Sequence, residues 1–443
     1  MEIKVCAVGG YNEVGKNMTA VKIDNEVIIL DMGFYLPKIV SFEEEGGHRK
    51  NLTSKDLIDI GAVPNDTVIS SWHDKVKAII VSHCHLDHLG AVPYLANKYN
   101  CPIIATPYTI EVLRGMLKDD DMVLKNQIKS LNANSSLKIS ENIEIEFLHV
   151  NHSTLQTVIV VIHTKEGDIV YANDFKFDNS PVIGQTSNYE KLKKLNTLAL
   201  ISDSLYADTE GKTPSEKVAR ELLREVMLGT NNERNTIIVT TFSSHIARLK
   251  SAIEFGEKLN RKIVFLGRSL AKYTYAAEKL NLINFSKDVE ICTYANQIRR
   301  KLSHIEKQGR DDYLIICTGN QGEPKAVLTK ILNNILPFRF LPEDQVIFSC
   351  RTIPVEINIK NRALVESKLK SKKVRIFKDV HTSGHCSRED LRDLINLTHP
   401  KHIIPTHGDT KKLSYLSDLA VEMGYKEGKN VHVMHNGQIL NLV

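Results

Sequence analysis

Apolar and polar positions along the chain fall into short alternating runs, typical of half-buried strands, and longer periodic runs, typical of amphipathic helices. Residues 3–8 alternate and end at a pair of glycines, and residues 19–23 and 26–30 form two further apolar runs. Turn residues separate these runs, so we predict an antiparallel opening meander. Residues 37–66 are polar, contain glycines and lack periodicity, which predicts a surface loop or insertion.

The next part of the chain predicts strands and helices in a βαββ order. The apolar run 76–81 is typical of a buried strand, and a helix is expected to begin near residue 89. The segments that follow are, in order, residues 102–105, 109–118, 143–150 and 157–163. Two later apolar runs end in acidic residues, at Asp174 and Asp203. We therefore expect a first α/β domain that extends to about residue 206.

After residue 206 the helical segments become longer and more charged. Residues 214–228 predict an amphipathic helix, and a βαβ unit follows at residues 235–241, 244–258 and 262–266. Further strands at 312–317 and 344–349 complete a parallel α/β insert. The last part of the chain predicts a strand at 374–377, a helix at 387–397, a strand ending at His407 and a terminal hairpin of residues 432–434 and 438–443.

A cluster of metal-binding side chains follows the predicted strand 76–81. It reads His83-Cys84-His85-Leu86-Asp87-His88. Neutral imidazoles and a carboxylate are the donors that zinc or a similar divalent ion prefers. His83 and His85 are two residues apart and can point to one side, whereas Asp87 and His88 lie around the turn, so the spacing suggests two ions. A polar turn with unrelated histidines is the alternative, and the density of the cluster argues against it.

Three residues elsewhere could complete or support such a site. Asp31 closes a predicted strand and is either a partner for a ligand imidazole or a plain turn residue. His152 lies in a loop between apolar strands and is either a third imidazole or an ordinary polar loop residue. A carboxylate at Asp174 can bridge two cations, which a monodentate imidazole cannot do.

Composition limits the class of protein. The chain has 443 residues, 42% of them hydrophobic and 25% charged, which fits a globular protein of two domains. Its net charge of +5 is the small difference between 58 basic and 53 acidic residues, so any nucleic-acid surface must be a local patch. Seven scattered cysteines without a C-x-x-C pair favour a reducing cytoplasm. We expect no membrane span and no signal peptide.

The motif His-x-His-x-Asp-His at a strand end resembles the signature of the metallo-β-lactamase fold, a four-layer αβ/βα sandwich whose members are mostly metal-dependent hydrolases. Two more histidine motifs follow the insert, with His385 in Ser-Gly-His and His407 in Pro-Thr-His-Gly-Asp. This layout resembles the β-CASP branch, whose members act on nucleic acids. The resemblance implies a metallo-β-lactamase domain at 1–206 and 373–443, interrupted by a parallel α/β β-CASP domain at 207–372.

Within that branch, the chain is similar to the ribonuclease J family. The similar stretches are Gly9-Gly10 to Gly15-Lys16-Asn17-Met18, residues 318–324, and Arg351-Thr352-Ile353-Pro354. The sequence departs from the family pattern at Asn320, where a small serine is common, and after Pro354, where Gly-Asn-Glu is usual. No extra C-terminal domain is expected, and this short form resembles the archaeal members.

The resemblance implies a role for each residue of the site. The first ion is held by His83, His85 and His152. The second is held by Asp87, His88 and His407, and Asp174 bridges the two. The ions are expected to be Zn²⁺, with Mn²⁺ as the alternative. His385 stays free of metal and donates a hydrogen bond or proton at the scissile phosphate, Asp203 orients His385, and Asp31 orients a ligand histidine. The catalytic candidates are therefore Asp87, His385, Asp203 and Asp31.

The same resemblance implies a 5′-to-3′ exonuclease that prefers RNA with a 5′-monophosphate. For the phosphate pocket we select His381, Thr382, Ser383 and Gly384, whose backbone N–H groups and side chains suit an anion. The alternative is that these residues only shape the turn before His385. The resemblance further suggests a homodimer.

Three other functions fit part of the sequence. A β-CASP endoribonuclease of the cleavage-factor type would use the same metal residues, but such proteins often carry added RNA-binding domains that are not visible here. A glyoxalase-type thioesterase would share the metal motif, but the insert and the Ser-Gly-His motif argue against it. A catalytically inactive RNA-binding scaffold would have no need of an intact ligand set.

Overall fold

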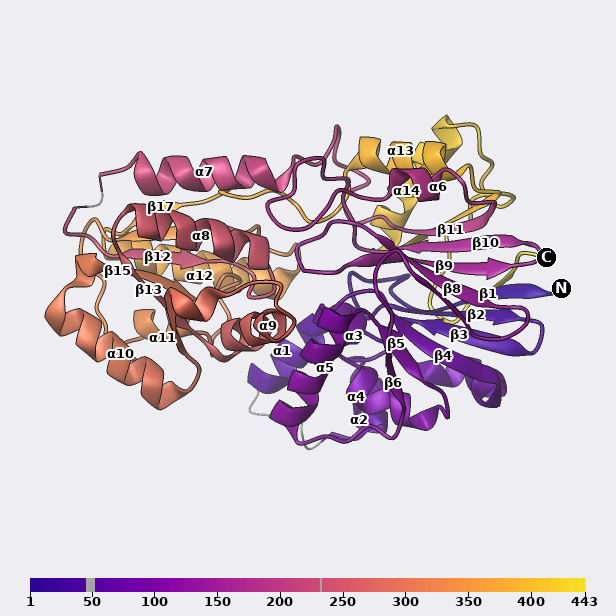
Figure 1. Ribbon diagram of the computed structural model, residues 1–443, viewed down its shortest axis with the longest axis horizontal. Coiled ribbons are helices and arrows are strands. Elements are labelled where there is room, and N and C mark those ends of the chain that lie inside the picture. The colour runs from indigo at the N-terminus through magenta and orange to yellow at the C-terminus, as the bar shows by residue number, and fades with distance from the viewer. Residues whose placement is uncertain (45–51, 232) are drawn as a thin grey trace. The chain divides into compact units, whose positions relative to one another are not determined.

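The computed structural model describes residues 1–44, 52–231 and 233–443 (Figure 1). The chain forms two compact units. The first comprises residues 1–179, 185–213 and 384–443, and the second comprises residues 180–184 and 214–383. The sequence predicts domain boundaries at 206/207 and 372/373. In the structure, the chain enters the second unit for its long segment after Thr213 and returns to the first unit after Ser383.

The first unit contains two sheets. One has seven strands in the order β19-β1-β2-β3-β4-β5-β6, and the other has six in the order β18-β11-β10-β9-β8-β7. The strands of the first sheet are β1 (Ile3–Gly9), β2 (Met18–Ile23), β3 (Glu26–Leu30), β4 (Val76–Val81), β5 (Ile103–Ala105), β6 (Ile128–Ser130) and β19 (Ile439–Asn441). Those of the second are β7 (Ser136–Lys138), β8 (Glu144–His149), β9 (Val158–Thr164), β10 (Gly167–Ala172), β11 (Thr197–Asp203) and β18 (His402–Thr406).

The two sheets pack face to face through one hydrophobic core. Val21 and Ile80 of the first sheet share this core with Phe147, Val160 and Ile201 of the second. Each such side chain contributes roughly 1.5–3 kcal/mol when it is fully buried. The opening meander is confirmed, because β1 pairs antiparallel with β2 and β2 with β3.

Helices cover the outer faces of both sheets, so the predicted four-layer αβ/βα sandwich is confirmed. A second hydrophobic cluster packs α6 (Tyr189–Leu192), α13 (Arg388–Thr398) and α14 (Thr410–Glu422) on the second sheet. Figure 1 shows α2, α4 and α5 beside the first sheet. The helices in this part of the chain are α1 (Leu36–Glu44), α2 (Ser54–Asp59), α3 (Leu86–Leu89), α4 (Val92–Leu95) and α5 (Pro107–Asp120).

Two local predictions for this unit are wrong. The segment 37–66 is not simply a loop, because α1 and α2 lie in it; residues 45–51 of the segment lie outside the described residues. Helix α2 forms because Thr53 and Asp56 make a capping box at its start and Leu57 is buried. The terminal hairpin is also absent: β19 pairs with β1 instead, since the edge of that long sheet offers a full set of backbone partners.

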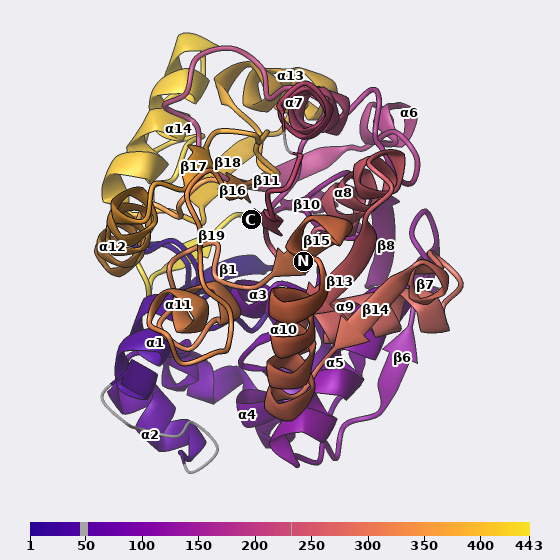
Figure 2. The same cartoon turned by 90° about the vertical axis from the view of Figure 1, so that its left-hand side faces the viewer.

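The second unit has one six-stranded sheet in the order β14-β13-β15-β12-β16-β17, and every pair in it is parallel (Figure 2). The predicted parallel α/β insert is therefore confirmed. Its strands are β12 (Ile237–Thr240), β13 (Lys262–Leu266), β14 (Val289–Cys292), β15 (Tyr313–Cys317), β16 (Gln345–Phe348) and β17 (Arg375–Phe377). Its helices are α7 (Glu216–Leu228), α8 (Ile246–Lys258), α9 (Arg268–Lys279), α10 (Ala295–Gln308), α11 (Val327–Leu332) and α12 (Glu356–Ser371), of which the last three pack on one face of the sheet.

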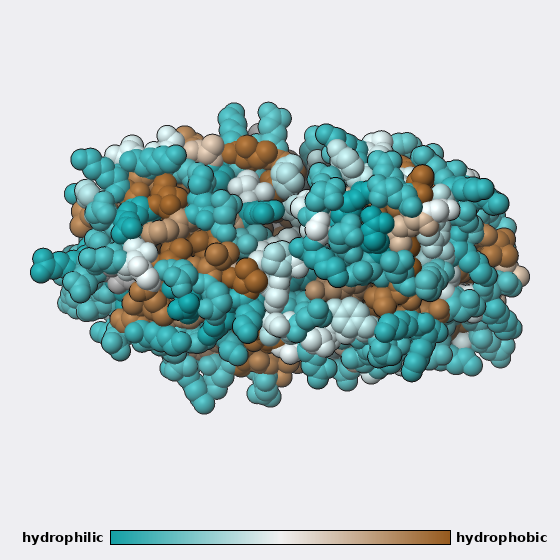
Figure 3. Space-filling model, turned by 90° about the horizontal axis from the view of Figure 1, so that it is seen from above, coloured by the Kyte–Doolittle hydropathy of each residue, from teal (hydrophilic) through white to brown (hydrophobic). Residues whose placement is uncertain are grey.

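The surface carries mainly polar side chains. On the face drawn in Figure 3, hydrophilic residues predominate and hydrophobic ones form smaller groups between them. Within the part of the chain that the structure describes, no helix combines the length and the apolar character needed to cross a membrane.

Candidate metal centre

Strand ends of the first unit bring the site residues together. Asp31 follows β3, His83 follows β4, Asp174 follows β10, Asp203 ends β11 and His407 follows β18. Three of them have a left-handed backbone, with φ of 60° at Asp31, 46° at Asp174 and 58° at His407. Such conformations cost about 1–3 kcal/mol each in residues other than glycine. The surrounding fold therefore holds these side chains in place against the local backbone preference.

Helix α3 positions Asp87 and His88 directly after the strand end. Asp87 lies in its first turn, and its carbonyl oxygen accepts a hydrogen bond of 3.0 Å from the backbone N–H of Asn17. A Cβ atom on Gly33 would lie 1.6 Å from the same carbonyl oxygen. Only glycine at position 33 permits this close approach of the segment after β3, so Gly33 is part of what places Asp87.

The first group of candidate ligands consists of His83, His85, His152 and Asp174. The ligand atoms of these residues all lie within 4.8 Å of one another. Oδ2 of Asp174 is 3.6 Å from Nε2 of His83 and 3.5 Å from Nε2 of His152. Nδ1 of His152 lies 2.7 Å from the carbonyl oxygen of Gly384, which keeps the proton on Nδ1 and leaves Nε2 as a donor to a metal.

The second group consists of Asp87, His88, Asp174 and His407. The ligand atoms of these residues also lie within 4.8 Å of one another. Oδ1 of Asp174 lies 3.2 Å from Nε2 of His88 and 3.7 Å from Nε2 of His407. Asp174 thus directs Oδ2 at the first group and Oδ1 at the second. This is the arrangement that a bridging carboxylate requires.

The side chains of both groups fit divalent cations. Nε2 of His83 and Oδ1 of Asp174 are buried and have no hydrogen-bond partner within the described residues. Buried polar atoms without a partner are costly, and here they point at other donor atoms. Burial and neighbouring imidazoles lower the pKa of His83 and of His152 well below the ordinary value. Both rings are therefore neutral, as metal ligands must be.

Negative charge is concentrated around His88. Burial opposes a charge on this ring, but Asp174, Asp87 and Asp31 raise the pKa of His88 well above its ordinary value. Several carboxylates that face one buried imidazole leave an excess of negative charge. A divalent cation balances that excess, so the electrostatics and the donor set agree.

Asp31 is fully buried behind His88 rather than in either ligand group. Its Oδ2 lies 2.7 Å from Nδ1 of His88 and accepts hydrogen bonds from the hydroxyls of Tyr171 (2.9 Å) and Ser82 (2.9 Å). The backbone N–H of Ser82 donates to Oδ1 at 2.8 Å. Asp31 therefore fixes the orientation of His88, and of the two possibilities left open by the sequence the geometry favours the partner over the plain turn residue.

His385 lies beside both groups and faces Asp203. Its Nδ1 is 2.7 Å from Oδ2 of Asp203, and its Nε2 is 3.8 Å from Oδ2 of Asp174. Burial opposes a charge on the ring, but Asp174 and Asp203 raise the pKa of His385 to about 9. The ring is therefore a proton donor near neutral pH in the absence of metal.

Asn17 is a site residue that the sequence reasoning did not identify. Its side-chain amide lies 2.8 Å from Nδ1 of His407 and 3.1 Å from Nε2 of His88. Asn17 is buried, and it holds the distal nitrogen of His407 so that Nε2 faces Asp174. Asn17 lay within a stretch similar to the ribonuclease J family, which was the only signal that pointed to it.

The four residues selected for a phosphate pocket are divided between the units. His381 and Thr382 belong to the second unit, where Nδ1 of His381 lies 3.5 Å from Nη1 of Arg248 and the Thr382 hydroxyl lies 3.4 Å from Glu216. Burial and the neighbouring Arg248 lower the pKa of His381 to about 2. Ser383 ends that unit, and Gly384 begins the last segment of the first.

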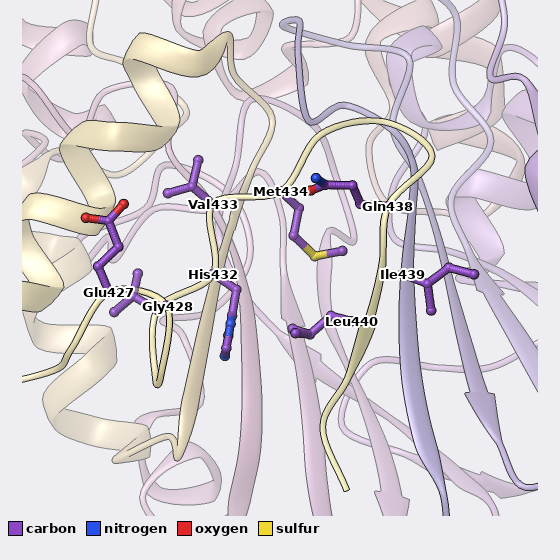
Figure 4. A pocket seen from close by; sticks show the side chains of 9 residues that line it. Glu427, Gly428, His432, Val433, Met434, Gln438, Ile439 and Leu440 are labelled. Atoms are coloured by element: carbon purple, nitrogen blue, oxygen red, sulfur yellow. The ribbon is translucent and has the colours of Figure 1, made fainter.

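A separate pocket lies near the C-terminus (Figure 4). It has a volume of about 390 Å³, and His432, Met434 and Leu440 are among its lining residues. None of the predicted site residues lines it. The metal centre is therefore defined by its converging side chains and not by this pocket.

Three families match successive parts of the chain. Residues 12–200 match the metallo-beta-lactamase superfamily, residues 234–365 match "Ribonuclease J, beta-CASP domain", and residues 372–434 match "Zn-dependent metallo-hydrolase RNA specificity domain". A crystal structure of a protein of unknown function from Enterococcus faecalis resembles the whole chain, with a TM-score of 0.66 and 17% identity, and covers all of both chains. That likeness concerns the fold alone.

Relatives match along the full length. Ribonuclease J of Methanocaldococcus jannaschii is 45% identical over 445 residues, which cover 100% of this chain and 99% of that protein. Ribonuclease J of Pyrococcus abyssi is 43% identical and covers 99% of this chain and 97% of its own length. Ribonuclease J 1 of Streptococcus pyogenes is 31% identical, and the match covers 100% of this chain and 74% of that protein. The divalent-metal residues, the fold and the full-length matches agree: the chain belongs to the ribonuclease J family.

Proposed function

We propose that this chain, a metal-dependent ribonuclease by its family, degrades RNA from the 5′ end and prefers a 5′-monophosphate. The observation that carries the hydrolytic part is the position of Asp174. One carboxylate oxygen faces the first group of histidines and the other faces the second group. A phosphodiester hydrolase needs charge stabilisation on both the attacking and the leaving oxygen, and two cations that share one carboxylate supply it.

In this proposal His83, His85 and His152 would hold one ion and Asp87, His88 and His407 would hold the other. Asp174 would offer one carboxylate oxygen to each. When bound, the ions neutralise charge on the phosphate oxygens and make a water molecule acidic enough to lose its proton near neutral pH. We propose Zn²⁺ as the resident ion because the donors are mainly imidazoles, with Mn²⁺ as the alternative.

The protein's own residues hold and donate the proton. His385 presents Nε2 to the reacting phosphate and donates a hydrogen bond or proton there. Asp203 accepts a hydrogen bond from Nδ1 of His385 over 2.7 Å and fixes the direction of the ring. Asp31 does the same for His88 over 2.7 Å. Both imidazole rings, His385 and His88, are thus oriented before the substrate binds. Such preorganisation of polar groups lowers an activation barrier.

The preference for a 5′-monophosphate is assigned to His381, Thr382, Ser383 and Gly384. The close approach at Gly384 supports this assignment, because a Cβ atom there would lie 2.9 Å from Nδ1 of His152. The main chain at this position therefore packs directly against a proposed metal ligand, which places the turn beside the metal centre. Backbone N–H groups in such a turn suit a phosphate.

A 5′-monophosphorylated RNA labelled at its 3′ end tests the direction of degradation, beside the same RNA with a blocked and structured 5′ end. We expect mononucleotides from the accessible end only. Discrete internal fragments from both RNAs would contradict the proposal and indicate an endoribonuclease of the β-CASP branch. Absence of cleavage in protein that contains its full metal complement would contradict ribonuclease activity itself and favour a small-molecule hydrolase.

A second pair of RNAs tests the preference for a 5′-monophosphate. The same RNA with a 5′-hydroxyl should be degraded more slowly than the 5′-monophosphate form. Equal rates would contradict the pocket at residues 381–384 and leave the direction of degradation untouched.

We further propose a cytoplasmic homodimer. Seven cysteines, all without a disulfide and all buried, suit a reducing compartment. Light scattering of the purified protein should give twice the mass of the chain, and metal analysis of the same sample should give two ions per chain. A monomer mass would contradict the dimer without affecting the assignment of the metal residues.

A further inference from the structure

One short segment has a positive charge larger than the net charge of the whole chain. Residues 367–378 contain six basic side chains and no acidic one. The chain as a whole has a net charge of +5, so the remainder sums to −1 when these six are subtracted. The six are Lys368, Lys370, Lys372, Lys373, Arg375 and Lys378, and we refer to them as the basic segment. A nearly neutral protein that acts on a polyanion must concentrate its positive charge locally, and this segment is one place where it does so.

The fold gathers the basic segment at one corner of the second unit. It begins in the last turn of α12 and continues into β17, an edge strand that pairs only with β16 in the sheet (Figure 2). The chain reverses at Lys373, where φ is 59° and the backbone N–H donates to the carbonyl of Lys370 over 2.9 Å. This tight turn places consecutive lysines on the same small surface.

Only part of this charge is neutralised within the protein. Lys378 pairs with Glu366 at 3.1 Å, and Arg375 lies 3.9 Å from Glu343. Lys368 donates to the neutral side chain of Asn333 over 2.6 Å. For Lys370, Lys372 and Lys373, the described residues include no carboxylate within ion-pair distance, and the first and last of these are exposed to solvent. Their charges therefore face water.

Stabilisation of helix α12 explains only a part of the segment. Basic residues in the last turn of a helix interact favourably with its dipole, and this accounts for Lys368 and Lys370. The effect fades beyond the last turn. Lys372, Lys373 and Arg375 lie after the helix end and gain little from it. A guanidinium at the edge of the sheet also lies over an aromatic ring, with Arg375 5.5 Å from the centre of Phe377.

We propose that the basic segment is a docking surface for the phosphate backbone of single-stranded RNA, made of residues other than those of the metal centre. This inference rests on the proposed ribonuclease function. Lysines that face water bind phosphates without reading sequence, and the Arg375–Phe377 pair offers a face for a base. RNA fits better than an acidic protein because the substrate class of the enzyme is itself a polyanion that extends beyond any single scissile bond.

The test measures RNA binding as a function of salt. The full-length, metal-loaded protein is titrated with a single-stranded phosphorothioate RNA of about 30 nucleotides, which keeps the phosphate charge and resists hydrolysis. The variant K370Q/K372Q/K373Q removes the three charges that have no carboxylate within ion-pair distance in the described residues. Each phosphate contact to a single strand contributes about 0.7 to the slope of log Kd against log salt, so the slope should fall by about 2.

A matched variant controls for net charge. K194Q/K426Q/K429Q also removes three lysine charges that are exposed, but in the first unit. We expect it to keep the wild-type slope, and melting curves should show that both variants are folded. Equal slopes for the two variants would overturn the inference, because the effect would then depend on net charge alone.

Further outcomes separate this inference from the proposed function. If the wild type hydrolyses RNA and K370Q/K372Q/K373Q binds RNA with an unchanged slope, the docking surface is overturned while the function stands. If polyglutamate competes with the RNA as strongly as poly(U) does, and the variant loses both, the surface binds acidic polypeptides and the RNA assignment is overturned. If the wild type neither binds nor hydrolyses RNA, the function fails and the inference fails with it.

Discussion

Nδ1 of His385 lies 2.7 Å from Oδ2 of Asp203, although 182 residues separate them in the chain. Asp203 ends β11, and His385 follows the return of the chain to the first unit. Asp203 is buried, so its carboxylate has few competing partners and fixes the ring. The other ring nitrogen, Nε2, lies 3.8 Å from Asp174. This pair therefore places a proton donor beside the candidate metal ligands.

Replacement of His385 by alanine should remove activity and leave the metal in place. His385 belongs to neither group of proposed ligands that share Asp174, so metal analysis should give the wild-type content. Loss of a general acid typically costs about 10²–10⁴-fold in rate, and we expect kcat on 5′-monophosphorylated RNA to fall by that factor. Asp203→Asn should lower kcat by a smaller factor and leave the metal content at the wild-type value. A fall in bound metal for His385→Ala would reassign this residue as a ligand.

Replacement of Asp174 by asparagine should remove metal from both groups. An amide cannot place a negatively charged oxygen toward each ion, and both groups depend on this residue. We expect metal content well below that of the wild type and a melting temperature that no longer rises when Zn²⁺ is added. A ligand at 100 times its dissociation constant stabilises a protein by about 2.7 kcal/mol, and that gain should disappear.

Asp418→Asn is the charge-matched control, because Asp418 is exposed on α14. It should keep both the metal and the Zn²⁺-dependent melting shift. Two ions retained by Asp174→Asn would show that this carboxylate does not bridge.

Replacement of Asn17 by alanine should weaken metal binding although Asn17 is not a ligand. The side chain holds His407 through a contact of 2.8 Å at Nδ1. Loss of such a supporting hydrogen bond typically costs about 10–100-fold in metal affinity or activity. Competition with a chelator measures the affinity directly. Asn12→Ala in the same loop, where Asn12 is exposed, should leave the affinity unchanged, and equal effects of the two variants would refute the role of Asn17.

Replacement of Glu216 by glutamine should change the acid sensitivity of the protein. Burial by itself would raise the pKa of Glu216, but Arg248 and then His245 lower it well below its ordinary value. Nε and Nη2 of the buried Arg248 donate to the two carboxylate oxygens over 2.6 and 2.8 Å. Because the folded-state pKa is lowered, this stabilisation is present above the unfolded pKa of about 4.3 and is lost as the pH falls toward the folded value.

Denaturant unfolding at pH 7 and near pH 4 measures the effect. Removal of one partner of a buried ion pair typically costs about 3–5 kcal/mol, so Glu216→Gln should unfold at clearly lower denaturant at pH 7. The difference in unfolding free energy between the variant and the wild type should be smaller at the lower pH. Glu221→Gln on the exposed face of α7 should leave the unfolding midpoint nearly unchanged at either pH, because water screens this surface ion pair. A constant difference for Glu216→Gln across the pH range would contradict this linkage.

The sequence alone determined the features that depend on neighbouring residues. Three histidines and an aspartate between His83 and His88 indicate a divalent-metal site because their spacing after a strand leaves few other uses for them. Alternating and periodic apolar runs likewise predicted the meander and the parallel insert, since a strand or helix must bury one face. Local patterns failed where other forces dominated, as in α2, which a capping box at Thr53 begins, and in β19, which pairs with β1.

Only the tertiary structure decided which distant side chains meet. From the residue pattern alone, His152 is either a third imidazole or an ordinary loop residue, and Asp31 is either a histidine partner or a turn residue. The family resemblance implied a role for both of them, and Asn17 had no assigned role. Their positions depend on two sheets that pack face to face and bring the ends of β3, β10 and β18 to one place. The left-handed backbones of Asp31, Asp174 and His407 are held by that packing, at a cost that no local sequence pattern reveals. Convergence of this kind arises from the burial of the whole core, and a sequence read a few residues at a time does not contain it.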